Sequence, residues 1–99
     1  MIEIRQTETF AKWFAELRDR RARLKVQARI DRLSLGNPGD VGPVGEGVSE
    51  MRIHYGPGYR VYFVQRGAMM VVLLAGGDKK SQDKDIRAAI ALADDLEDI

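Results

Sequence analysis

Residues 48–64 read VSEMRIHYGPGYRVYFV, and this stretch decides the fold. Apolar and polar side chains alternate up to Tyr55, which is the period of a β-strand. Gly56-Pro57-Gly58 has the composition of a tight turn. Residues 59–64 are rich in the aromatic and β-branched types that strands favour. The segment therefore predicts an antiparallel hairpin.

The hairpin has two unlike faces if its turn pairs Tyr55 with Tyr59. On one face Ile53 lies opposite Val61, and Met51 opposite Phe63. A shift of one residue would put arginine into the core, so the pattern favours this register over its neighbours.

The other face is predicted to be polar, with His54 opposite Arg60 and Arg52 opposite Tyr62. Glu50 lies on the same face. Cations that are close together across strands repel each other. The face is thus either an ordinary solvated surface with exposed ion pairs to Glu50, or a surface built to hold an anion.

Helices and further strands flank the hairpin. Residues 2–5 alternate as a short strand, and Thr7 or Thr9 can cap a helix that carries an apolar stripe. A second helix runs to near Leu35, with an apolar face and an adjacent arc of cations. The apolar face and the cationic arc are, respectively, Ala22, Val26, Ile30 and Leu33, and Arg21, Lys25, Arg29 and Arg32.

The remaining segments complete an α+β domain. Residues 36–47 hold five glycines and two prolines, which predicts a long surface loop. Residues 69–75 are a near-continuous apolar strand, typical of one covered on both faces. Residues 76–80 are read as a loop, and Ser81 as the cap of a last helix. The order β-α-α-β-β-β-α predicts an antiparallel three- or four-stranded sheet packed by helices, in one domain over residues 1–99.

Composition bounds the class of protein. The 99 residues include no cysteine and one histidine, so a disulfide framework or a metal site is not expected. We expect no cofactor either, because residues 76–80 lack P-loop spacing. The N-terminus has no signal-peptide core, and no apolar run approaches the ~20 residues of a spanning helix. A cytoplasmic protein without membrane association is therefore predicted.

Charge is unevenly distributed although the net charge is only +1. Residues 1–35 carry nine Lys/Arg against five Asp/Glu, whereas residues 78–99 carry four against seven. A basic front half suits an anionic partner, although a basic helix facing an acidic one would give the same pattern.

Several segments together resemble the RelE/ParE toxin superfamily, and most closely its HigB-like "addiction module killer protein" branch. The resemblance is carried by the segments 50–53, 56–63, 73–82 and 84–86, which read EMRI, GPGYRVYF, LLAGGDKKSQ and KDI. Phe10-x-x-Trp13 and the turn from Leu35 to Asp40 also fit.

The resemblance implies the toxin of a type II toxin–antitoxin system, silenced by a helix-turn-helix antitoxin. The complex would repress its own operon, so that operator DNA is reached only through the antitoxin. RelE-like and HigB-like members cleave mRNA on the ribosome, which predicts a metal-independent endoribonuclease that inhibits translation. ParE-like members instead inhibit DNA gyrase without nuclease chemistry, and this is the alternative.

Carried onto this chain, the family's basic strand positions fall on Arg52 and Arg60, and its basic loop on Lys79 and Lys80. Some RelE-like enzymes also end in a catalytic tyrosine or histidine. The last six residues here contain neither, so the sequence offers no terminal base of that kind.

RNA cleavage by the 2′-hydroxyl needs a base, charge stabilisation at phosphorus and an acid for the 5′ oxygen. His54 is a candidate base, because neighbouring cations would favour its neutral form; it could instead position RNA or take no part. Lys79 or Lys80 would donate the proton or hold the phosphate. The arc Arg21, Lys25, Arg29 and Arg32 would bind ribosomal RNA by charge. Tyr62 would stack on a base or pack within the hairpin.

Overall fold

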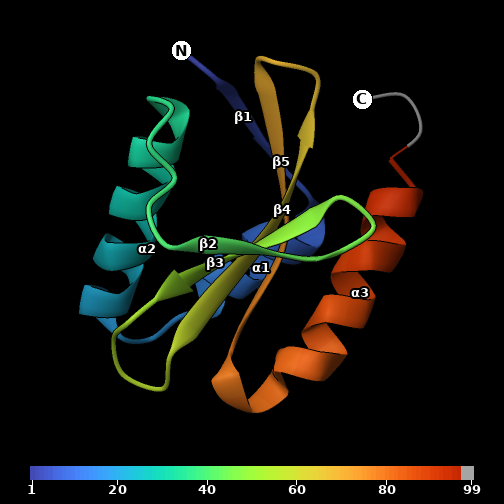
Figure 1. Cartoon of the computed structure of the whole chain (residues 1–99). Helices are drawn as coiled ribbons and strands as arrows, with labels where there is room; N and C mark the ends of the chain where they lie inside the picture. Colours follow the sequence, from blue (N-terminus) through green and yellow to red (C-terminus); the bar gives the residue numbers. More distant parts are fainter. Residues whose placement is uncertain (97–99) are drawn as a thin grey trace.

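The computed structural model describes residues 1–96 and contains a sheet with helices on both faces (Figure 1). The elements are β1 (Glu3–Gln6), α1 (Glu8–Glu16), α2 (Arg20–Ser34), β2 (Val41–Gly45), β3 (Val48–Ile53), β4 (Tyr59–Arg66), β5 (Met70–Asp78), the 3-10 turn η1 (Lys79–Ser81) and α3 (Gln82–Asp94). The α+β class is confirmed.

The sheet has five strands in the order β1-β5-β4-β3-β2, and it is mixed. β1 runs parallel to β5, whereas β2 to β5 form antiparallel neighbours. The expectation of an antiparallel sheet of three or four strands is therefore wrong. Tight turns enforce antiparallel pairing only between consecutive strands, and two helices separate β1 from the rest of the sheet.

The fifth strand lies inside the predicted long loop. Residues 41–45 form β2, which pairs with β3 and lies at the edge of the sheet. Pro43 lies within this strand, opposite Ser49, and an edge strand tolerates proline because one side of it needs no hydrogen bonds. The glycines and prolines of this segment led to the prediction of a loop instead of a strand.

One face of the sheet is covered by α1 and α2. Thr7 caps α1, its hydroxyl accepting from the Phe10 amide, and Asp19 caps α2. The apolar face predicted for α2 is confirmed, since all four of its residues are buried. They pack with Phe10, Met51 and other residues of the facing strands.

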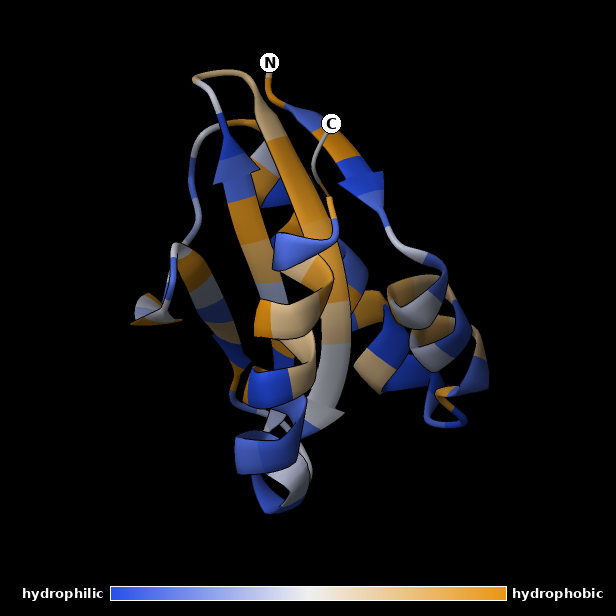
Figure 2. Ribbon diagram, turned by 90° about the vertical axis from the view of Figure 1, so that its right-hand side faces the viewer, coloured by the Kyte–Doolittle hydropathy of each residue, from blue (hydrophilic) through white to orange (hydrophobic). Residues whose placement is uncertain are grey.

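The other face is covered by α3. The last helix was predicted, but the sheet face that it covers was not. Val48, Tyr62, Val64, Val72 and Leu74 form a second core against Ala89 and Ala93. Most of the hairpin's second face is therefore buried rather than solvated. β5 lies between β1 and β4 with cores on both faces, as its apolar run predicted. Figure 2 shows that strand hydrophobic along most of its length and paler toward its end.

β5 continues beyond the predicted strand end, through Gly76 and Gly77 to Asp78. A side chain at Gly76 would clash with the Trp13 ring, and one at Gly77 with the Asp85 carboxylate. Two glycines in a strand are explained here by this close approach. Asp78 then caps η1, and Ser81 precedes α3 without making a side-chain cap; its hydroxyl donates to Asp85 at 2.5 Å.

Candidate functional site

Four segments come together at one edge of the sheet, where β2 begins and β3 ends: the residue before β2, the end of β3, the loop after it, and η1. In Figure 1 the β3–β4 loop and η1 lie at the lower end of the molecule. The β2–β3 pairing places Asp40 beside Arg52, whose amide donates to the Asp40 carbonyl at 3.0 Å. Gly58 brings the β3–β4 loop against Lys79, because a Cβ at Gly58 would lie 3.5 Å from the Lys79 Cβ.

Asp40 joins the imidazole and a guanidinium at this edge. Its Oδ2 lies 2.6 Å from His54 Nε2, and its Oδ1 accepts from Arg52 NH1 at 2.8 Å. The His54 side chain is 74% exposed, so the ring is open to a ligand. We call Asp40, Arg52 and His54 the edge triad.

The edge triad fixes the orientation of the histidine. The hydrogen bond from His54 and then that from Arg52 hold the pKa of Asp40 below its usual 3.8. Asp40 is thus a carboxylate near neutral pH, which only accepts hydrogen bonds. His54 Nε2 must then carry the hydrogen, and Nδ1 is left as the free ring nitrogen.

Arg52 also connects the edge triad to a buried acid. Glu50 is 3% exposed and accepts from Arg52 Nε at 3.1 Å and from Gln82 Nε2 at 2.7 Å. Arg60 Nε lies 3.7 Å from the other oxygen of this ion pair, Glu50 Oε1. Glu50 therefore ties β3, β4 and the start of α3 together, rather than forming exposed ion pairs.

The hairpin register differs by two residues from the predicted one. Arg52 lies opposite Arg60, and Glu50 opposite Tyr62. His54 lies beyond the end of β3, so it faces no strand partner. A shift of two residues leaves every side chain on its predicted face, and it arises because the connecting loop spans residues 54–58 rather than three residues.

Two residues that were predicted to lie on an exposed face, Arg60 and Tyr62, are largely shielded from solvent. The Arg60 side chain is only 11% exposed. Tyr62 is fully buried under α3, so its ring is unavailable for stacking on a base. Burial raises the pKa of Tyr62 far above its usual range, and its hydroxyl has no hydrogen-bond partner among residues 1–96.

The cationic arc of α2 divides into two roles. Arg29 is half-buried and donates to the carbonyl oxygens of Arg52 at 2.5 Å, Pro38 at 3.0 Å and Asp40 at 3.2 Å. It thereby braces the segment that carries Asp40, and burial lowers its pKa. An RNA-binding role for Arg29 conflicts with this use of its donors.

Arg21, Lys25 and Arg32 remain exposed on the same side of α2. Lys25 Nζ lies 5.4 Å from the centre of the Tyr55 ring, and the Tyr55 hydroxyl donates to Asp19 at 2.9 Å. These contacts attach the start of α2 to the loop that carries His54. Lys79 and Lys80 are exposed on η1, at the far side of that loop.

Sequence reasoning missed Asp40 as the partner of His54. Its one signal was an acidic residue within a glycine-rich segment too long for a simple connection. Within residues 1–96 no three or more Asp, Glu or His gather into a group that could hold a metal ion. No helix in this range has the length and apolar character needed to cross a membrane. Residues 97–99, part of the C-terminal stretch without tyrosine or histidine, lie outside the described range.

Comparison with known proteins identifies the family of this chain. Residues 12–97 match the family model described as phage-derived protein Gp49-like. An uncharacterized protein from Haemophilus influenzae is 48% identical over 95 residues, which cover 96% of each chain. The chain therefore belongs to the Gp49-like phage-derived family, an addiction-module toxin family related to the RelE-type toxins.

Proposed function

We propose that this chain is the toxin of a type II toxin–antitoxin system and that it cleaves mRNA on the ribosome. The observation that carries the proposal is the edge triad: an exposed histidine held by a carboxylate, beside a guanidinium. Membership of a toxin family supports the general function and an antitoxin partner.

The edge triad suits the transfer of protons in RNA cleavage. The 2′-oxygen of a ribose attacks the adjacent phosphorus, the bond from phosphorus to the 5′ oxygen breaks, and a 2′,3′-cyclic phosphate forms. One group must accept the 2′-hydroxyl proton, and one must donate a proton to the leaving 5′ oxygen. His54 Nδ1 can do the first when the ring is neutral or the second when it is charged.

Asp40 then acts as a positioning residue for His54. It fixes which nitrogen carries the hydrogen and which faces outward, and its charge stabilises the imidazolium that forms when His54 accepts a proton. Arg52 holds Asp40 in place from the other side.

The cations that reach RNA are those at the surface. Arg60 is only 11% exposed and lies beside Glu50, so Lys79 and Lys80 on η1 are the cations that would contact the phosphate. Arg21, Lys25 and Arg32 form a basic flank on the other side of the His54 loop, and they would contact ribosomal RNA through its backbone, without regard to sequence. A ribosomal target would place the action in the cytoplasm.

The direct test is to induce the protein in cells and map mRNA 5′ ends, with a DNA supercoiling assay in parallel. We expect new 5′-hydroxyl ends within translated frames, and no such ends when translation is blocked before induction. His54→Gln provides the matched control. Growth arrest with intact mRNA and lost supercoiling would instead support the gyrase alternative and overturn the proposal.

A further inference from the structure

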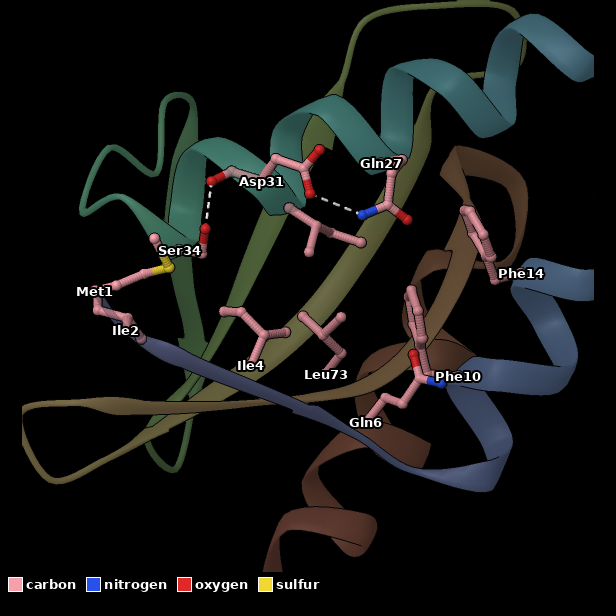
Figure 3. Close-up of a pocket in the computed structure, with 11 residues that line it drawn as sticks. Met1, Ile2, Ile4, Gln6, Phe10, Phe14, Gln27, Asp31, Ser34 and Leu73 are labelled. Carbon is pink, nitrogen blue, oxygen red and sulfur yellow. Dashed lines mark hydrogen bonds between the residues drawn. The ribbon is translucent and has the colours of Figure 1, made fainter.

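A cavity among the described residues lies away from the edge triad, on the opposite flank of α2. Its volume is about 550 Å³, within the range of ligand-binding pockets. β1 and α1 form one wall and α2 the other (Figure 3). The lining is mainly apolar and includes Ile2, Ile4, Phe10, Phe14, Ile30 and Leu73.

A second cavity of about 320 Å³ extends this one along α2. Phe14 and Gln27 line both cavities, so the two form one groove. The extension is lined by Leu24, which is 63% exposed although it is a large apolar residue within a helix. An apolar groove continued by an exposed leucine is typical of a surface that a partner covers.

The two ends of the groove carry opposite charges. Arg20 and Arg23 line the extension, and the Arg23 guanidinium lies 5.6 Å from the centre of the Phe14 ring. Asp31 lines the far part of the groove, where its carboxylate accepts from Gln27 Nε2 at 2.9 Å. An occupant that matches this surface has apolar side chains along its length and carboxylates where it meets Arg20 and Arg23.

The groove and the edge triad use different sides of one helix. At 100° per residue, the positions of Arg21, Lys25 and Arg32 lie on one flank of α2's buried stripe, and those of Arg20, Arg23 and Gln27 lie on the other. Arg29 on the first flank donates hydrogen bonds to the carbonyl oxygens of Asp40 and Arg52, whereas Gln27 on the second donates one to Asp31. A partner in the groove leaves His54 uncovered.

We infer that this groove binds an acidic segment of the antitoxin that carries large apolar side chains. The inference rests on the proposed toxin function, because that function supplies the partner. Neutralisation then involves a surface separate from the edge triad, and the groove contact can be removed without removing toxicity.

The experiment compares three exposed positions by the same measurements. Leu24→Glu and Arg23→Glu place negative charge in the groove, and Arg87→Glu makes the same charge change as Arg23→Glu on α3, across the sheet. Each variant is co-expressed with its cognate antitoxin, separated from it, and then titrated with the purified antitoxin by calorimetry. Growth is followed with and without antitoxin, and circular dichroism verifies the fold.

We expect Leu24→Glu and Arg23→Glu to weaken antitoxin binding at least tenfold, and Arg87→Glu to change it less than twofold. Cells with Leu24→Glu should stop growing even when the antitoxin is present. Wild-type affinity in both folded groove variants would overturn the inference, as would a stable dimer of the free chain that Leu24→Glu dissociates. Absence of mRNA cleavage would contradict the proposed function but leave these binding results unchanged.

Discussion

The carboxylate of Asp40 and the imidazole of His54 lie 2.6 Å apart, although neither belongs to a helix or a strand. Arg29 and Arg52 hold the Asp40 side of this pair, through its carbonyl and its carboxylate respectively. A braced loop thus supplies the orientation that a histidine needs to move a proton.

Asp40→Asn should lower cleavage more than it lowers binding. The asparagine side chain is isosteric but neutral, so it stabilises the imidazolium less and can present an amide instead of an oxygen to Nε2. We expect single-turnover cleavage of ribosome-bound mRNA to fall by about 10–100-fold, below the loss that removing a general acid or base causes. Asp94→Asn, the same change at the exposed end of α3, should cleave normally. Equal rates for the two variants would mean that Asp40 does not position His54.

His54→Gln should cause the larger loss. Glutamine keeps a hydrogen-bonding group but cannot carry a proton between pH 5 and 9. The single-turnover rate should fall by roughly 10²–10⁴, and the pH dependence of the residual rate should flatten. Binding to the ribosome, measured separately by sedimentation, should change little. A variant with an unchanged rate constant but weaker binding would assign His54 to positioning RNA instead.

The sequence predicts the helices and strands of this fold better than it predicts which of them pair or pack together. The helix that contains Val26 is evident from its period, and the hairpin from its turn. The parallel pairing of β1 with β5 depends on contacts between residues about 67 positions apart, which no local pattern encodes. For the same reason α3 could be predicted as an amphipathic helix, but not the sheet face that it covers.

The candidate site shows the same limit. Arg52 and His54 were identified from their place on one strand, but their common partner Asp40 lies twelve and fourteen residues away in a segment read as a loop. Sequence alternation identified the face of Arg60 correctly. It could not show that Gln82 and the rest of α3, from another element, would close over that face.

Arg60→Ala should destabilise the fold more than the same substitution at an exposed arginine would. The variant removes a cation next to the buried Glu50 and leaves a cavity where its stem packed. Breaking a well-formed buried ion pair costs about 3–5 kcal/mol. We expect a smaller loss here, because Arg60 Nε lies 3.7 Å from Glu50 without a hydrogen bond and Arg52 and Gln82 still donate to Glu50. Urea unfolding measures the effect. Arg87→Ala, at an exposed position, should change stability by less than about 0.5 kcal/mol, and an equal effect of the two would contradict this account.

The stabilising effect of Asp40 should depend on pH in one direction. Its pKa in the folded protein is lowered, by the hydrogen bond from His54 first and that from Arg52 second, below the 3.8 of an unperturbed aspartate. A lowered pKa contributes stability above the unfolded value, and that contribution is lost as pH falls through the folded pKa. The difference in melting temperature between wild type and Asp40→Asn should therefore shrink as pH falls below about 3.8. A difference that does not shrink below that pH would contradict the assignment.

Gly76→Ala tests whether the Gly76-Gly77 pair serves packing. The backbone at Gly76 is extended β5 strand, so alanine meets no conformational strain, but its Cβ would overlap the Trp13 ring. Trp13 is wedged between Phe10 and Tyr59, with ring centroids 5.7 Å and 6.3 Å away, so it has little room to move. Overpacking of this kind costs about 1–3 kcal/mol.

Thermal unfolding should show that loss, and a smaller residue at position 13 should restore part of it. We therefore expect the double variant Trp13→Leu, Gly76→Ala to be less destabilised than the sum of its two single variants, because the new methyl group occupies space that the ring vacated. Cleavage by Gly76→Ala below its melting temperature should stay near that of the wild type. Strict additivity would show that Gly76 is required for something other than the approach of Trp13.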